Sequence, residues 1–259
     1  MALLTVSDDG PVRTLTLSNP GRKNAIPPDG WDELTSAFRG FADSGLRVLV
    51  VTGADGDFCS GADLADAGFG PGAGVSANVA WMRRPGAAAI ALHRLSAPTI
   101  AAVDGIAAGA GMNLALGCDI VIATEPARFT EIFVRRGLTL DFGGTWLLPR
   151  IVGRARALDL ALTGRIVGSA EALEMGLVAR VVPADELGAT VAEVAEALAA
   201  GAPLAQRFIK TGIDRAAAMT FEQGIAFETE AQGVLLSSAD AAEALDAFLT
   251  KRAAHFEGR

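Results

Sequence analysis

Two glycine-rich segments, each placed directly after a short apolar run, constrain the fold of this chain more than any other feature. Residues 57–64 (DFCSGADL) follow the run at 48–51, and residues 105–113 (GIAAGAGMN) follow the run at 99–103. Short continuous apolar runs are typical of strands buried on both faces. We expect each segment to lead into a helix, whose first backbone amides have no partner within the helix and favour an anion. The glycines by themselves are equally compatible with simple tight turns.

The first part of the chain alternates between strand-like and helix-like patterns. The further strand-like segments are residues 3–7 and 12–17, which alternate in polarity as a β-hairpin does, and the apolar runs 120–123 and 178–182. The amphipathic, helix-like segments are residues 27–45 and 77–95. Strands that alternate with helices are typical of a layered α/β domain with parallel pairing. We therefore predict an α/β core over residues 1–195.

The last part of the chain has helical patterns throughout. They cover residues 187–198, 203–217, 221–236 and 240–253. We predict a separate helical region over residues 196–259. The stretch 69–75 is rich in glycine and proline without a period, which predicts a mobile loop there.

Composition narrows the classes of function. A chain of 259 residues with 51% hydrophobic content can bury a sizeable core. The net charge of −8 argues against a nucleic-acid binder, which needs clustered cations, but a few local cations can still hold a phosphorylated small ligand. Apolar stretches are interrupted before they reach the ~18 residues of a membrane span. The N-terminal segment also lacks a basic signal-peptide start, so we expect a cytoplasmic protein that binds neither nucleic acid nor membrane.

Nucleophile and metal patterns are absent from the sequence. Cys59 and Cys118 do not have the spacing of metal ligands, so we expect no metal. Cys59 has no neighbouring histidine to activate it, which favours a structural thiol over a reactive one. His93 and His255 are isolated, and surface or core positions are the favoured interpretation for both. No serine lies in a nucleophile-elbow pattern.

A dinucleotide-binding fold is an alternative interpretation of the second glycine-rich segment. Gly109 and Gly111 follow a predicted strand, and Glu125 ends the next one, where an acid that binds ribose could lie. However, the third glycine of that pattern is Leu114 here, and the strand is internal rather than N-terminal. We therefore disfavour this alternative.

Five segments resemble, in the same order along the chain, the sequence pattern of the enoyl-CoA hydratase/isomerase (crotonase) superfamily. They are residues 58–64 (FCSGADL), 97–105 (APTIAAVDG), 109–119 (GAGMNLALGCD), 143–153 (GGTWLLPRIVG) and 163–178 (TGRIVGSAEALEMGLV). Each segment is modest alone, but five in order form a strong pattern. Within the superfamily, the stretch from Gly143 to Arg150 is most similar to the isomerases that act on ring-epoxyphenylacetyl-CoA.

The resemblance implies a crotonase-like α/β fold, a superhelix of ββα units whose C-terminal helices mediate oligomerisation as a homotrimer or a dimer of trimers. It implies an acyl-CoA substrate, with coenzyme A as part of that substrate and no separate cofactor. Arg22 and Lys251 are the first candidates to contact the CoA phosphates, with Lys23, Lys210 and Arg252 as others. For each of them, a solvated surface charge is the commoner role.

The resemblance also assigns backbone groups to the substrate. The amides of Ala62 and Ala110 would both point at the thioester oxygen and stabilise an enolate. The main-chain carbonyl of Ser60, beside Gly61, would meet the adenine amino group. Two convergent amides are thus expected to define the reaction centre.

The acid/base residue departs from the pattern of the family's hydratases. Hydratases of the family use two glutamates, but Asn113 and Phe133 stand at those positions and are counted here as substrate-binding residues. Asp141 matches the aspartate of isomerases in the superfamily, in which one acid moves a proton between carbons. Asp141 could instead cap the turn that follows it. Glu131 is a rival acid, for which we expect a surface position on a helix.

Three functions remain open at this point. The favoured one is an enoyl-CoA isomerase that uses Asp141 as its acid/base. The second is a hydratase, or another reaction of the superfamily, with an unidentified acid/base. The third is a protein of the same fold that binds acyl-CoA without turnover.

Overall fold

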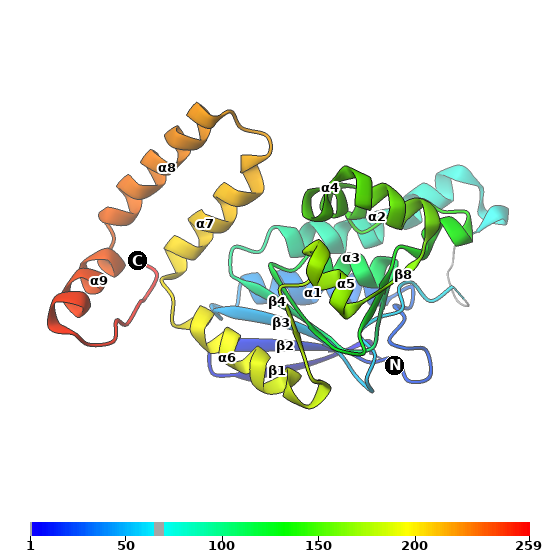
Figure 1. Cartoon of the computed structure of the whole chain (residues 1–259), viewed down its shortest axis with the longest axis horizontal. Coiled ribbons are helices and arrows are strands. Elements are labelled where there is room, and N and C mark those ends of the chain that lie inside the picture. The colour runs from blue at the N-terminus through cyan, green and yellow to red at the C-terminus, as the bar shows by residue number, and fades with distance from the viewer. Residues whose placement is uncertain (1, 65–69) are drawn as a thin grey trace.

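The large sheet of this protein starts with a hairpin and continues with parallel strands (Figure 1). The computed structural model describes residues 2–64 and 70–259. The strands lie in the order β1 (Leu4–Asp9), β2 (Val12–Leu17), β3 (Val48–Gly53), β4 (Thr99–Val103), β6 (Ile120–Thr124) and β9 (Arg180–Val182). β1 and β2 pair antiparallel, and each later neighbour pairs parallel. The predicted hairpin and the predicted strands at 48–51, 99–103, 120–123 and 178–182 are all present.

The two faces of this sheet pack against different helices because successive side chains of a strand point to opposite sides. On one face, Leu49 and Val51 belong to the main hydrophobic core together with Trp31 and Phe38 of α1 (Gly30–Ala42). The same core includes residues of α2 (Gly74–His93), α3 (Ala110–Leu116), α4 (Gly144–Thr163) and α5 (Ser169–Met175). This face of the sheet is therefore buried, as the continuous apolar runs predict.

The other face of the sheet is covered by α6 (Leu187–Ala199). Val48 and Val50 form a second core there with Val191 and Val194 of this helix. α6 is thus part of the α/β layers, and it ends four residues beyond the boundary predicted at residue 195.

A second, smaller sheet differs from the expectation. Its strands β5 (Ile106–Ala108), β7 (Arg128–Thr130) and β8 (Ile166–Gly168) have three residues each. The sequence predicts no strand within the second glycine-rich segment, residues 105–113, but β5 lies in its middle and pairs parallel with β7. The strand was missed because β5 gains its partners from chain segments that are distant in sequence.

The segment after the first glycine-rich turn also differs from the expectation. No helix begins within residues 57–64; instead Ala62 forms an isolated parallel bridge with Ile26. Residues 65–69 lie outside the described part of the chain. Of the loop predicted at 69–75, residue 69 is therefore not described, residues Pro71–Ala73 form the short helix η1, and α2 begins at Gly74.

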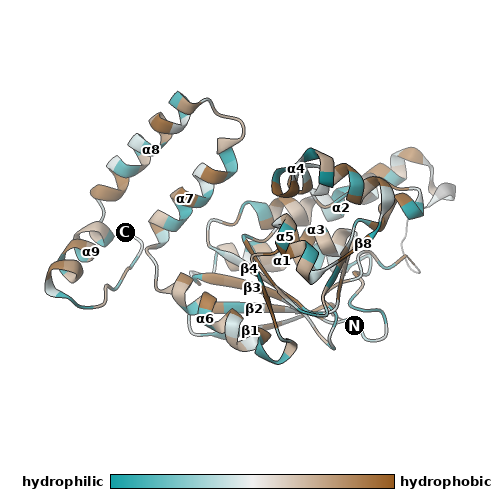
Figure 2. Cartoon of the chain, in the orientation of Figure 1, coloured by the Kyte–Doolittle hydropathy of each residue, from teal (hydrophilic) through white to brown (hydrophobic). Residues whose placement is uncertain are grey.

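The helices α7 (Pro203–Ala216), α8 (Phe221–Leu236) and α9 (Ala239–Thr250) extend away from the sheets as a separate arm (Figure 1). Figure 2 shows apolar residues spaced along all three of these helices. Several of them are exposed, including Ile213, Phe221 and Phe248. Among the described helices none is individually long and apolar enough to cross a membrane; the pair Ala184–Ala199 and Pro203–Ala216 meets those criteria only when joined across a bend of 105°.

Close backbone packing at Gly111 gives a test of this fold. A methyl group at Gly111 would lie 2.2 Å from the carbonyl oxygen of Cys59, so the backbone would have to shift. We expect Gly111→Ala to lower the free energy of unfolding by about 1–3 kcal/mol, measured by chemical denaturation. Gly86→Ala is the matched control, because nothing lies within 4 Å of a methyl group there and alanine favours a helix. Equal stability of Gly111→Ala and the wild type would contradict this packing.

Candidate active site

The two glycine-rich segments meet through direct backbone hydrogen bonds. Cys59 pairs with Ala107 of β5 as an isolated parallel bridge. The Cys59 N–H donates to the Ile106 carbonyl at 2.9 Å, and the Ala108 N–H donates to the Cys59 carbonyl at 2.9 Å. The first turn is therefore held against the strand that leads into α3.

This contact places the amides of Ala62 and Ala110 in the same region. A methyl group built on Gly61, the residue before Ala62, would lie 3.6 Å from the Ala110 nitrogen. Ile26 donates to the Gly61 carbonyl at 2.8 Å and accepts from the Asp63 N–H at 2.9 Å, which leaves the Ala62 N–H on the opposite side of the chain. Ala110 is the first residue of α3, where an N–H has no partner within the helix.

We call the backbone N–H groups of Ala62 and Ala110 the amide pair. Neither N–H donates a hydrogen bond within the described structure. No hydrogen bond joins either N–H to a described residue. Two unused donors on adjoining segments can bind one oxygen atom between them. The convergence expected from the sequence is thus compatible with this geometry.

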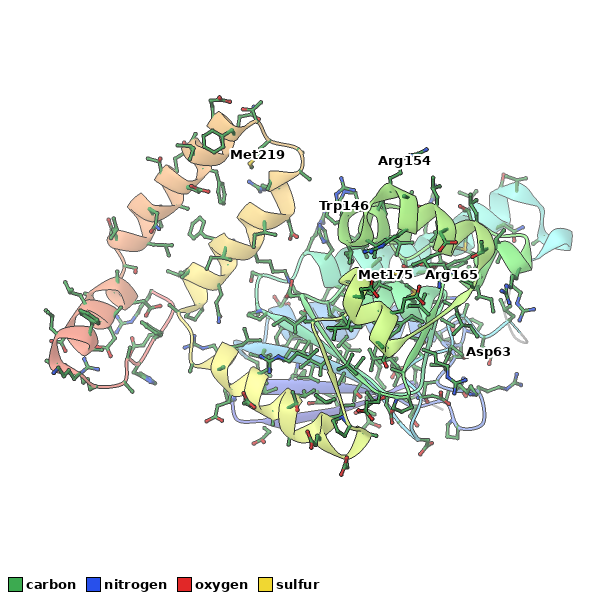
Figure 3. All side chains as sticks on the ribbon, viewed as in Figure 1. Asp63, Trp146, Arg154, Arg165, Met175 and Met219 are labelled. Carbon is green, nitrogen blue, oxygen red and sulfur yellow. The ribbon has the colours of Figure 1, made fainter. Side chains whose placement is uncertain are left out.

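Ser60 and Arg22 lie together at the outer edge of the first turn. The Ser60 N–H donates to the Lys23 carbonyl at 2.9 Å, and the Ser60 hydroxyl donates to the Arg22 carbonyl at 3.0 Å. Arg22 pairs with Asp63 at 3.7 Å, and Lys23 pairs with Asp57 at 3.5 Å. Figure 3 shows Asp63 on the side of the core away from the α7–α9 arm. Both cations remain largely exposed and belong to the segment that contacts the turn.

Asn113, Glu131 and Asp141 form a second group, the carboxyl cluster. Asn113 lies on α3, Glu131 lies between β7 and the short helix η2 (Ile132–Arg136), and Asp141 precedes α4. The Asn113 side-chain nitrogen Nδ2 donates to Glu131 Oε2 at 3.4 Å and to the Asp141 main-chain carbonyl at 3.0 Å. One amide group therefore connects the two acidic residues.

The carboxyl cluster is largely buried and poor in hydrogen-bond donors. Asn113 is 0% exposed and Glu131 is 1% exposed. Three of its buried oxygens, Asn113 Oδ1, Glu131 Oε1 and Asp141 Oδ1, have no hydrogen-bond partner among the described residues. Burial raises the pKa of Asp141 to about 7. Burial, together with the negative charge of Asp141, raises the pKa of Glu131 to about 8.

Asp141 does not act as a helix cap. The residue before α4 is Gly143, in a left-handed conformation, and no side chain caps the helix there. The Gly144 N–H donates to the main-chain carbonyl of Asp141 at 2.9 Å, so the carboxylate is not needed for the turn. Its oxygen Oδ1 accepts no hydrogen bond from the described residues. This geometry favours a chemical role for Asp141 over the capping role.

Apolar side chains surround both groups. A methyl group on Gly109, just before Ala110, would lie 3.5 Å from the Phe133 ring, so this buried ring packs beside the start of α3. Phe142 contacts Trp31, with ring centroids 5.9 Å apart. Phe133 thus lies against the start of α3, and Phe142 directly follows Asp141 in the chain.

The remaining candidates lie elsewhere or are already paired. Lys251 ends α9 on the arm, away from the sheets within this chain (Figure 1). Arg252 pairs with Glu243 and Asp246 beside it. Lys210 pairs with Asp119 at 2.8 Å, which fastens α7 near the strands.

The described residues offer neither a reactive cysteine at position 59 nor a metal site. Cys59 is buried, and burial raises the pKa of its thiol to about 12, so the thiolate is scarce at neutral pH. No group of three or more metal-ligating side chains occurs in residues 2–64 and 70–259.

Comparison with known sequences identifies the family. The sequence profile described as Enoyl-CoA hydratase/isomerase matches residues 8–259. The chain belongs to the enoyl-CoA hydratase/isomerase family. The resemblance inferred from the five segments is thereby confirmed.

Relatives within the family differ in their named reactions. The chain is 38% identical over 252 residues to the 1,2-epoxyphenylacetyl-CoA isomerase of Escherichia coli K12, covering 96% of this chain and 95% of the relative. It is 39% identical over 245 residues to a probable enoyl-CoA hydratase of Rhodobacter capsulatus, covering 95% and 94%. The solved enoyl-CoA hydratase of Bacillus anthracis matches with a TM-score of 0.93 and 31% identity, over 99% of this chain and 100% of that one. These matches confirm the crotonase-like fold.

Glu131 is the site residue that sequence reasoning misplaced. It was expected on a helix surface, but it is almost fully buried beside Asn113, and the negative charge of Asp141 contributes to its raised pKa. The expectation was wrong because Glu131 directly follows β7, whose partners β5 and β8 have no local sequence signal. Of the two residues expected at the hydratase glutamate positions, Asn113 belongs to the carboxyl cluster and Phe133 packs beside Gly109 at the start of α3.

Proposed function

We propose that this protein isomerises a double bond in an enoyl-CoA thioester, with Asp141 as the acid/base. The observation that carries this proposal is the Asp141 carboxyl, whose buried oxygen Oδ1 has no partner among the described residues and which is not used as a cap. Asn113 and Phe133, at the positions of the two hydratase glutamates, carry no charge. One available carboxylate suits a reaction in which a proton leaves one carbon and returns to another.

The mechanism follows from the two groups of the site. The ionised Asp141 removes a proton from the carbon next to the thioester, and the electron pair moves onto the carbonyl oxygen as an enolate. The N–H groups of Ala62 and Ala110 donate to that oxygen and stabilise its charge. The protonated Asp141 then returns the proton to a carbon further along the chain, and the double bond has moved. Its raised pKa of about 7 suits both the base and the acid step.

The CoA part of the substrate is proposed to lie along the first turn. Ser60 and Gly61 directly precede Ala62, so a ligand that contacts the amide pair passes their backbone. Arg22 and Lys23 are exposed beside them and are available to phosphate groups. No cofactor beyond the coenzyme A of the substrate enters this proposal.

A hydratase is the second candidate, and one observation favours it. The carboxyl cluster holds a second acid, Glu131, which could share the activation of water with Asp141. Relatives named as probable enoyl-CoA hydratases add support. The third candidate, a binding protein without turnover, would leave the unpartnered Asp141 oxygen without a use.

Asp141→Asn tests the isomerase directly. We expect it to reduce isomerisation of 3-enoyl-CoA substrates and exchange of their α- and γ-protons with deuterated water by at least about a thousandfold, because the base is lost. Thioester binding, measured by calorimetry, should change little. Asp185→Asn, at an exposed position on the short helix η3 (Ala184–Glu186), is the control. Undiminished exchange would remove Asp141 from the mechanism, and rapid hydration of crotonyl-CoA by the wild type would favour the hydratase.

Replacement of one backbone amide by an ester tests the amide pair. Incorporation of lactic acid, the hydroxy analogue of alanine, at position 110 removes the N–H and preserves the side chain. We expect the rate to fall by about 10²–10³, because one donor to the enolate oxygen is lost. The same replacement at the exposed Ala184, where η3 begins, should leave the rate unchanged. An unchanged rate at position 110 would rule out that amide as a donor.

The α7–α9 arm is proposed to join copies of the chain as a trimer or a dimer of trimers. Its support is a groove of about 1000 Å³ between α7 and α8, lined by apolar residues such as Phe208, Ile213 and Leu236. Lys251 on α9 lies away from the site of its own chain, so any contact with CoA would require a neighbouring copy.

Sedimentation velocity tests this assembly. We expect the wild type to sediment as three or six chains. Ile213→Glu places a charge in the exposed apolar groove and should shift the mass towards a single chain, because burying an unpaired charge is costly. Val6→Glu on β1, the same change at an exposed apolar position off the arm, is the control. A monomeric wild type would contradict the assembly.

A further inference from the structure

The carboxyl cluster has more hydrogen-bond acceptors than donors. Its three buried unpartnered atoms, Asn113 Oδ1, Glu131 Oε1 and Asp141 Oδ1, are all oxygens. The donor it contains, Asn113 Nδ2, is already directed at Glu131 Oε2 and the Asp141 carbonyl. Buried acceptors without donors are costly, and the other two unpartnered buried side-chain atoms of the described residues, Trp31 Nε1 and Arg47 Nη1, donate to none of them.

No cationic side chain of the described residues pairs with the Glu131 or Asp141 carboxyl to balance two negative charges in the carboxyl cluster. The sequence of α3 has no charged residue. The basic residues on the adjoining elements are exposed, and none forms an ion pair with either carboxyl in the described chain; they are Arg128 on β7, Arg135 and Arg136 on η2, and Arg150, Arg154 and Arg156 on α4. Asp141 is therefore the charged group that acts on Glu131, and two negative charges would face each other in a dry region.

We propose that Glu131 and Asp141 hold a single proton between them, with Glu131 as the protonated member, so that Glu131 is a positioning residue that keeps Asp141 ionised as the base. A proton on Glu131 Oε1 turns one of the three acceptors into a donor. It also leaves one negative charge in the cluster instead of two. The proposal rests on the proposed isomerase function for its kinetic consequence, but the location of the proton does not depend on it.

Glu131 is more deeply buried than Asp141, as expected if Glu131 is the protonated member. Glu131 is 1% exposed, whereas Asp141 is half-buried and precedes α4 at the end of a loop. The more deeply buried acid retains its proton to higher pH, since burial disfavours the charged form. Burial and the charge of Asp141 together raise the pKa of Glu131 to about 8, above the pKa of Asp141, which burial raises to about 7.

A pH profile of kcat/KM for Glu131→Gln gives the kinetic test. The wild type should gain activity as Asp141 ionises near pH 7 and lose it as Glu131 ionises near pH 8, because a second negative charge opposes the enolate. Glutamine mimics the neutral carboxyl, so the variant should stay within about threefold of the wild type at pH 7 and lack the alkaline decline. Glu186→Gln, at an exposed position on η3, should retain the wild-type profile.

Thermal unfolding gives a test that needs no activity. The unfolded protein releases the Glu131 proton near the ordinary pKa of 4.5, and the folded protein releases it near 8. Stability from this group is therefore fully present below pH 4.5 and declines as the pH rises towards 8. The midpoint of Glu131→Gln relative to the wild type should rise between pH 5 and pH 8 and then level off, while Glu186→Gln should show a constant difference.

The outcomes separate the proton assignment from the proposed function. A pH-independent difference in midpoint, or a glutamine variant that does not fold, would overturn the shared proton. An infrared titration of the wild type with labelled glutamate should show one protonated carboxyl at pH 7, and a fully ionised glutamate signal would also overturn it. If no enoyl thioester is isomerised but the midpoints diverge as described, the proposed function fails and the proton assignment stands.

Discussion

The structure depends on the backbone contact between the turn at Cys59 and the strand β5. Two hydrogen bonds of 2.9 Å join Cys59 to Ile106 and Ala108, so two loops from separate strand–helix connections meet at main-chain distance. Such an approach leaves no room for side chains at Gly105 and Gly111, where an added methyl group would lie 2.2 Å from a neighbouring carbonyl oxygen. The glycines are therefore required by the contact itself, and the amide pair is a consequence of it.

Helix α3 carries this contact to the carboxyl cluster. Ala110 begins the helix, and Asn113 follows three residues later, on the same side of the first turn. A single short and fully buried helix thus positions both the Ala110 N–H, the proposed donor to the enolate oxygen, and the amide that connects Glu131 with Asp141. A displacement of α3 would affect both groups together, so the packing of Gly111 against Cys59 has consequences beyond stability.

The sequence predicts those parts of the fold whose signal is local. The strands β3, β4, β6 and β9 follow from continuous apolar runs, the β1–β2 hairpin from alternating polarity, and α7 and α8 from helical periodicity, because each pattern lies within the element itself. The three-residue strands β5, β7 and β8 have no such signal, since their stability comes from partners distant in sequence. The position of Glu131 also lacks a local signal. A glutamate beside a short amphipathic run is expected to be exposed, and only the packing of α3 and α4 around it explains its burial. Asp141 could be identified by its motif, but only the structure shows that its oxygen Oδ1 has no hydrogen-bond partner among the described residues.

The same packing bears on the choice between an isomerase and a hydratase. A hydratase must hold a water molecule between two acidic groups, which requires both space and donors for that water. Here the Asn113 amide nitrogen lies between the Glu131 carboxyl and the Asp141 main-chain carbonyl, in a region where the nearby oxygens are inaccessible to solvent. An isomerase requires the opposite condition, because water that reached the enolate or the base would compete for the proton being moved. The buried Asp141 Oδ1, which has no partner among the described residues, therefore favours proton transfer between carbons.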